Sequence, residues 1–139
     1  MKTAIVVFSD PKSGSDEALG RVFNALAAAY DIKHRNEHVE IVFQGAGTRW
    51  AGVLTQKDHP AYALYKAVED RVVGVSCGCA DVFGARADAE KNGFSLITTN
   101  QVPVRQASRA SRRTRATATP YSPSEPLDPA SMPVWRPAC

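Results

Sequence analysis

Residues 3–8 read Thr-Ala-Ile-Val-Val-Phe, and this short, almost continuous apolar run decides the fold class. A run of this kind, rich in β-branched residues, is typical of a strand buried on both faces of a parallel sheet. A polar turn follows the run, and apolar residues then recur at intervals of three and four, as on one face of a helix. Those residues are Leu19, Val22, Phe23, Leu26 and Tyr30. The chain therefore begins with a strand followed by a helix.

Strand and helix patterns continue to alternate down the chain. We expect further strands at residues 39–43, 72–75 and 94–98. Between them, one helical segment starts at Pro60, and another covers about residues 80–92 and stops at Gly93. Four strands separated by helices predict an α/β fold, a three-layer α/β/α sandwich with a mostly parallel sheet.

The composition is that of an ordinary globular protein. The chain has 139 residues, of which 44% are hydrophobic and 22% are charged, which fits about one domain. No apolar run reaches the ~18 residues that a membrane span requires, and the first strand leads directly into polar residues without a signal-peptide pattern. We therefore expect a cytoplasmic protein without a membrane partner.

The charge balance changes near Pro103. Residues 1–103 carry 11 Lys and Arg against 12 Asp and Glu, whereas residues 104–139 carry 6 against 2. The second segment also holds six of the nine prolines and no periodic pattern of large apolar residues. We therefore predict an α/β domain over 1–103 and a basic, Pro-rich tail over 104–139, disordered or atypical.

Three interpretations of the tail stay open. It is a solvated segment without a role, or a basic arm that binds acidic partners or nucleic acid through phosphate contacts, or the product of a shifted reading frame near Val104. We expect no nucleic-acid partner except through this tail.

Two cysteines, Cys77 and Cys79, follow the third predicted strand and precede a helix. Backbone amides at such a position favour an anion and hence a reactive thiolate. The alternative is that both are small buried packing residues. Three cysteines in the chain, two of them one residue apart, argue against a disulfide framework. The histidines show no paired spacing typical of a metal site.

The order of these features resembles the DsrE/DsrF-like family, which includes the YchN and TusD types. The resemblance covers about residues 1–103 and is carried by three stretches: 2–11, 39–47 and 73–77. It implies a small α/β/α protein that assembles as a trimer or hexamer. The tail departs from the family pattern, in which a short helix and a last strand follow at this point.

The resemblance also implies a chemistry. Family members carry sulfur as a cysteine persulfide, and that role falls on Cys77, with Cys79 as a neighbour that resolves or shares the sulfur. The protein is then a sulfurtransferase-like sulfur carrier with donor and acceptor proteins as partners and no cofactor. Transfer follows the rules of thiol–disulfide exchange.

Two other loops support a rival interpretation, a non-catalytic anion- or nucleotide-binding module of flavodoxin-like form. Hydroxyls, glycines and one arginine follow the first two strands, where phosphates bind in related sheets. These residues are Ser9, Ser13, Gly14, Ser15, Gly45, Gly47 and Arg49. Serines before a helix also serve simply as caps. A structural subunit of an oligomer is the third possibility.

Overall fold

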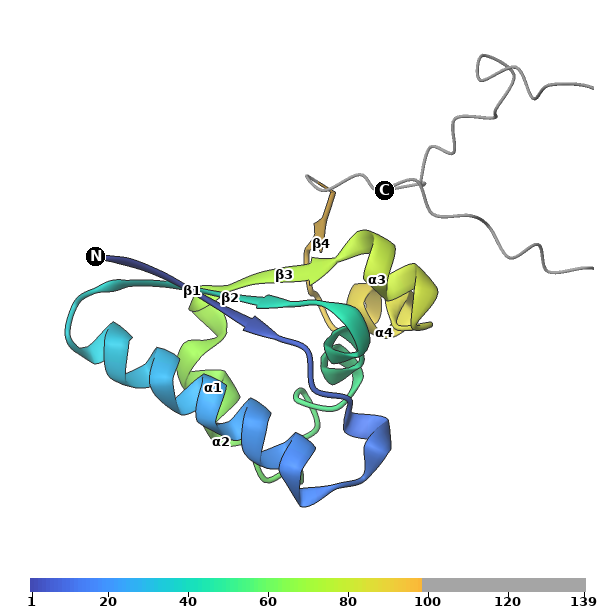
Figure 1. Ribbon diagram of the computed structural model, residues 1–139, viewed down its shortest axis with the longest axis horizontal. Coiled ribbons are helices and arrows are strands. Elements are labelled where there is room, and N and C mark those ends of the chain that lie inside the picture. The colour runs from blue at the N-terminus through green and yellow to red at the C-terminus, as the bar shows by residue number, and fades with distance from the viewer. Residues whose placement is uncertain (99–139) are drawn as a thin grey trace, which may run out of the picture. The chain divides into compact units, whose positions relative to one another are not determined.

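A computed structural model describes residues 1–98 and shows four strands in one sheet (Figure 1). The strands pair in the order β1-β2-β3-β4, and every pair is parallel. Their bounds are β1 Lys2–Val7, β2 His38–Phe43, β3 Val72–Ser76 and β4 Leu96–Ile97. The predicted mixed α/β class with a parallel sheet is therefore confirmed.

Helical segments connect the strands. The α-helices are α1 Asp16–His34, α2 Tyr62–Val68, α3 Cys77–Val82 and α4 Arg86–Lys91. Shorter 3₁₀ segments are η1 Pro11–Ser13, η2 Gly45–Gly52 and η3 Glu69–Arg71. Ser15 caps α1, because its hydroxyl accepts a hydrogen bond from the Ala18 amide at 3.2 Å. The capping role that the sequence allowed for Ser15 is therefore confirmed.

The helical layer follows from the strand order. Each strand pairs with the next one along the chain, so right-handed crossovers place every connection on the same face of the sheet. Figure 1 shows α1 and α2 together on one side of the strands, and residues of α1, η2, α2, α3 and α4 join a single hydrophobic core. The arrangement is consistent with a three-layer sandwich, of which residues 1–98 supply the sheet and the helical layer on one face.

The two faces of the sheet differ in burial. Along β2, Val39, Ile41 and Phe43 are buried in the core, whereas the alternate residues His38 and Glu40 are exposed. Along β1, Ala4 and Val6 are likewise exposed, so the prediction that the first strand is buried on both faces is wrong for residues 1–98.

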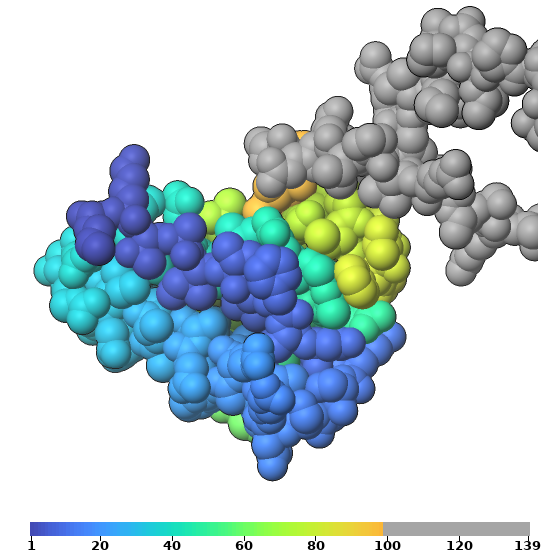
Figure 2. All heavy atoms as spheres, viewed as in Figure 1, coloured from blue at the N-terminus to red at the C-terminus, as the bar shows by residue number. Residues whose placement is uncertain are grey.

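The first strand lies at the edge of the described sheet, and only one of its faces packs against helices. Val6 is therefore 42% exposed, and Phe8, just beyond the strand, is 61% exposed. In the space-filling view this N-terminal strand, drawn in dark blue, lies at the surface (Figure 2). We call the face that carries Ala4, Val6, Val42 and Val73 the uncovered face.

The segment 80–92 forms two helices rather than the one predicted. α3 ends at Val82 and α4 begins at Arg86, with Gly84 between them at a φ of 68°. Glycine adopts this left-handed conformation without the steric cost that other residues carry. The chain can therefore turn back on itself between the two helices.

A glycine also determines how η2 packs. A Cβ at Gly47 would lie 2.1 Å from the carbonyl oxygen of Val7, so no larger residue fits while the backbone keeps this approach. The sequence correctly predicted that the second strand ends here. It did not predict that the chain continues as a 3₁₀ helix of eight residues.

The predicted basic tail, residues 104–139, lies outside the described residues. Within residues 1–98, no helix combines the length and the apolar character needed to cross a membrane.

Candidate functional site

The loops that follow the first three strands meet at the carboxyl edge of the sheet. Arg49 in η2 forms an ion pair with Asp10 after β1, with 2.6 Å between Nη1 and Oδ2. Its Nε also donates to the carbonyl of Phe83, beyond α3, at 3.0 Å. These contacts confirm that the three loops lie side by side, as parallel strands require.

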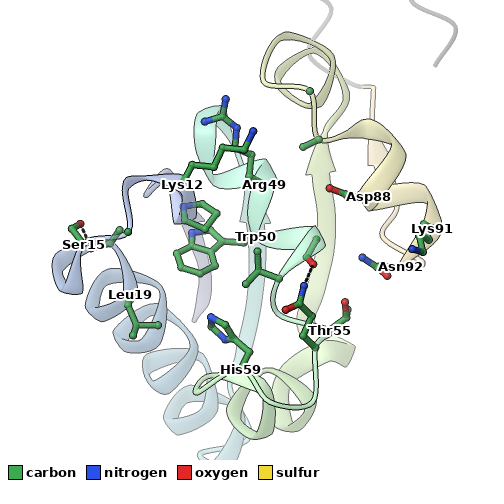
Figure 3. A pocket seen from close by; sticks show the side chains of 18 of the residues that line it. Lys12, Ser15, Leu19, Arg49, Trp50, Thr55, His59, Asp88, Lys91 and Asn92 are labelled. Carbon is green, nitrogen blue, oxygen red and sulfur yellow. Dashed lines mark hydrogen bonds between the residues drawn. The ribbon is translucent and has the colours of Figure 1, made fainter.

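A cavity of about 760 Å³ opens at this edge (Figure 3). Its walls are the loop after β1, the first turn of α1, η2 with the loop after it, and α4. We call it the η2 cavity. Its polar lining includes Lys12, Ser15, Arg49, Thr55, His59 and Asp88. Its size is that of a small-molecule site.

The structure separates the predicted ligand-binding residues into two groups. Gly14, Ser15 and Arg49 line the η2 cavity. The remaining four, Ser9, Ser13, Gly45 and Gly47, are not among its lining residues.

The residues outside the cavity have structural contacts. The carbonyl and hydroxyl of Ser9 accept hydrogen bonds from the indole Nε1 of Trp50 at 2.7 and 3.1 Å. The Ser13 hydroxyl donates to the carbonyl of Asp10 at 2.8 Å. These bonds fix the loop after β1 against η2, so the loop forms a stable wall.

The charge of Arg49 is largely compensated. Its guanidinium is held by Asp10 and lies 5.4 Å from the ring centre of Phe83. An arginine already paired with a carboxylate offers less attraction to a ligand phosphate than a lone one. Arg49 therefore fixes the wall of the cavity more than it attracts anions.

His59 is a polar group that faces the cavity. Its Nδ1 accepts a hydrogen bond from the Ala61 amide at 3.2 Å, so the proton of the neutral ring is assigned to Nε2. The ring meets Trp50 edge to face at 5.9 Å between centroids. Partial burial lowers the pKa of His59, and nearby Asp58 opposes that shift.

The predicted thiol site lies elsewhere on the same edge. Cys77 is the first residue of α3 and is 3% exposed, and it is disulfide-bonded in the structure. Cys79 is a free thiol and is half-buried. Positions two apart on a helix do not face each other, and the two sulfurs therefore lie in different surroundings.

Arg86 supplies a positive charge beside Cys77. Its Nη2 donates to the Cys77 Sγ at 3.7 Å, and the same guanidinium binds Asp81 Oδ1 at 3.0 Å and Glu90 Oε1 at 3.2 Å. α3 has only six residues, so its dipole contributes less than this neighbouring cation. The cation is shared between sulfur and two carboxylates.

Sequence reasoning missed Arg86 because it assumed one continuous helix. In a continuous helix, nine residues span about 13 Å along the axis, which would keep Arg86 far from Cys77. The turn at Gly84 reverses the chain and brings the two together. The glycine was the available signal, since it breaks an otherwise helical pattern.

The described chain shows no group of three or more His, Cys, Asp or Glu that could hold a metal ion.

Comparisons with known proteins add one distant relative. An uncharacterized protein of Methanocaldococcus jannaschii is 26% identical over 88 residues, which cover 63% of this chain and 71% of the relative. No family model matches the sequence, and no solved structure matches it significantly.

Proposed function

We propose that the protein is a small sulfur carrier that holds sulfane sulfur on Cys77 as a persulfide and passes it to a partner thiol. The observation that carries this proposal is the contact between the Arg86 guanidinium and the Cys77 Sγ. A positive charge beside a cysteine favours the thiolate, which is the reactive form in sulfur transfer. The resemblance to DsrE/DsrF-like proteins over residues 1–103 points to the same cysteine.

The reaction starts from reduced Cys77. A dithiol first opens the disulfide by thiol–disulfide exchange, supplying two electrons and becoming a disulfide itself. The Cys77 thiolate then attacks the outer sulfur of a donor persulfide. A new S–S bond forms to Cys77, the donor S–S bond breaks, the proton stays on the transferred sulfur, and the donor leaves as a thiolate. The reverse of this step delivers the sulfur to an acceptor.

Burial of Cys77 sets a condition on the exchange. At 3% exposure the sulfur is shielded from water, and a partner thiol reaches it only when the segment around α3 opens locally. Cys79, which is half-buried and free, is the more accessible of the two thiols. Comparing the two cysteines therefore tests whether sulfur loading depends on the position beside Arg86, which Cys77 has, or on accessibility, which is greater for Cys79.

Mass spectrometry of the intact protein tests the proposal. Protein reduced with dithiothreitol and freed of it is exposed to glutathione persulfide, and any added sulfur is mapped by peptide analysis. We expect one sulfur atom on Cys77, none on the Cys77→Ser variant, and unchanged loading of Cys79→Ser. Sulfur on Cys79 alone, or no adduct on reduced Cys77, would overturn the proposal.

Arg86 is a positioning residue in this scheme. Arg86→Gln should slow persulfide loading about three- to tenfold, because a charge-assisted contact to the thiolate is lost. Arg86→Lys should recover part of the rate, and Arg21→Gln, which alters an exposed ion pair on α1, should change nothing. A rate for Arg86→Gln equal to the unaltered protein would remove Arg86 from the mechanism.

We also propose that copies of the chain assemble through the uncovered face, as a trimer or hexamer, in a reducing cytoplasmic compartment. Val6 and Val73 on this face are 42% and 41% exposed, and β1 offers an edge for pairing. Sedimentation tests this: Val6→Lys should give monomers, while Val82→Lys, at a 60% exposed position on α3, should not. A monomeric unaltered protein at micromolar concentration would exclude the assembly.

A further inference from the structure

The η2 cavity is separate from the thiol site and has its own unpaired polar groups. Neither Cys77 nor Arg86 lines it. Within residues 1–98, the Lys12 ammonium and the Asp88 carboxylate make no hydrogen bond or ion pair. Figure 3 shows Lys12 coming from the loop after β1 and Asp88 from α4. Two opposite charges therefore border one cavity without neutralising each other.

The total charge of the lining limits the kind of ligand. Its charged residues are Lys12, Arg49, Lys91, Asp16 and Asp88. Since Asp10 already compensates Arg49, two cations and two carboxylates are left. A di- or triphosphate requires an excess of positive charge, which this lining lacks. A molecule that itself carries both charges matches it.

The positions of Lys12 and Asp88 beside the cavity each depend on a neighbouring residue. The Asp10 side chain accepts from the Lys12 amide at 2.9 Å and thereby fixes the turn that carries Lys12. The Asp88 carboxylate lies against η2, where a Cβ at Gly52 would be only 2.8 Å from its Oδ2. The absence of a side chain at Gly52 leaves room for this carboxylate.

The remaining lining supplies neutral contacts. His59 has Nε2–H available as a donor, because its Nδ1 accepts from the backbone. Leu19 and Val53 add apolar surface, and Thr55 adds a hydroxyl. A donor and apolar surface in the same cavity as two opposite charges suit a ligand with a carbonyl oxygen and a small apolar side chain, as in a short peptide.

We propose that the η2 cavity binds a small zwitterion of short-peptide size, with its carboxylate against Lys12 and its ammonium against Asp88. The volume of about 760 Å³ leaves room for two or three residues. This proposal does not depend on sulfur carriage, since it uses none of the residues of the thiol site.

Calorimetric titration with the tripeptide Ala-Leu-Ala tests the proposal, using three forms of the probe. One form has both termini free, one has an acetylated amino terminus, and one has an amidated carboxyl terminus. We expect the free form to bind with a millimolar or lower Kd, and each blocked form to bind about three- to tenfold more weakly.

Variants then assign each charge. Asp88→Asn should weaken binding of the free peptide about three- to tenfold and leave the acetylated peptide unaffected, because that peptide has no ammonium to lose. Lys12→Gln should weaken binding of the free peptide by a similar factor. It should leave the amidated peptide unaffected, because that peptide has no carboxylate to lose. Lys57→Gln and Asp31→Asn, exposed residues outside the cavity, serve as charge-matched controls.

Three outcomes would overturn the proposal: no saturation with the free peptide at millimolar concentrations, equal affinity for all three forms, or tighter binding of ATP than of the free peptide. Persulfide loading of Cys77 is measured on the same variants. Persulfide loading should persist in Asp88→Asn and Lys12→Gln, so that a failure of peptide binding can be told apart from a failure of sulfur carriage.

Discussion

The two faces of the sheet are built from alternate residues of the same strands, yet they have opposite surroundings. On the covered face, Ile41 is fully buried under the helical layer. On the uncovered face, Val6 is 42% exposed although it is equally apolar. The difference shows that hydrophobicity in a strand does not by itself decide burial; the side on which the crossovers pass decides it.

The largest effect should come from the closest backbone approach in the helical layer. Gly47→Ala should lower the free energy of unfolding by about 4 kcal/mol, because the new Cβ would lie 2.1 Å from the Val7 carbonyl oxygen. Gly20→Ala in α1 is the control, since nothing lies within 4 Å of its Cβ. That change should stabilise by about 0.5–1 kcal/mol. Urea unfolding measures the free energy of unfolding of both variants. Similar free energies for Gly47→Ala and Gly20→Ala would contradict the packing described for η2.

A pair of truncations compares the faces directly. Ile41→Ala should cost about 3 kcal/mol, because it removes a fully buried side chain and leaves a cavity. Val6→Ala should cost less than about 1 kcal/mol at concentrations where the protein is monomeric. Chemical denaturation at low protein concentration provides both values. Equal losses would mean that the uncovered face is covered after all.

The loss of stability at high pH tests how well the helical layer buries Tyr65. Tyr65 in α2 is buried beside Phe94, and this burial raises its pKa to about 12, with a smaller contribution from Glu69. The unfolded chain releases this proton near pH 10, so stability is fully present below that pH and falls by about 2 kcal/mol between 10 and 12. Tyr65→Phe should remove this loss. The same alkaline decline in Tyr65→Phe would assign it to other groups.

The smallest effect concerns an ion pair that joins α1 to η3. Lys33 donates to Asp70 at 2.6 Å and lowers the pKa of that carboxyl from 3.8. Stability from this pair is present above pH 3.8 and is lost as the pH falls through the lowered value. Because Asp70 is 53% exposed, Lys33→Gln should cost less than about 1 kcal/mol at neutral pH. The cost should be smaller in acid, where the Lys33 ammonium keeps only its 2.8 Å hydrogen bond to the Ala67 carbonyl. Thermal unfolding at both pH values measures it; a cost of equal size in acid would mean that Lys33 acts through the Ala67 carbonyl and not through Asp70.

Much of the fold could be predicted because periodicity is a local signal. The runs at residues 3–8 and 39–43 mark strands within one residue of their observed starts, and Ser15 marks the start of α1. The sidedness of the sheet could not be predicted, because it depends on the order in which strands pair. That order gives no local pattern in the sequence.

The candidate site was harder to predict for the same reason. Cys77 and Arg49 were found because they follow strands, where parallel sheets place their loops. Arg86 was missed, since its approach to Cys77 depends on the φ of 68° at Gly84. Lys12 and Asp88 were missed because they border one cavity only after α4 has folded back beside η2.

The pairing order β1-β2-β3-β4 also affects how the chain can fold during synthesis. Each new strand pairs with the one made just before it, so its neighbour is already outside the ribosome when it emerges. None of the four strands within residues 1–98 has to wait for a later segment to be inserted between two earlier ones, and entanglement during their assembly is avoided. Residues 1–98 can therefore be added to the growing domain one strand and one connection at a time.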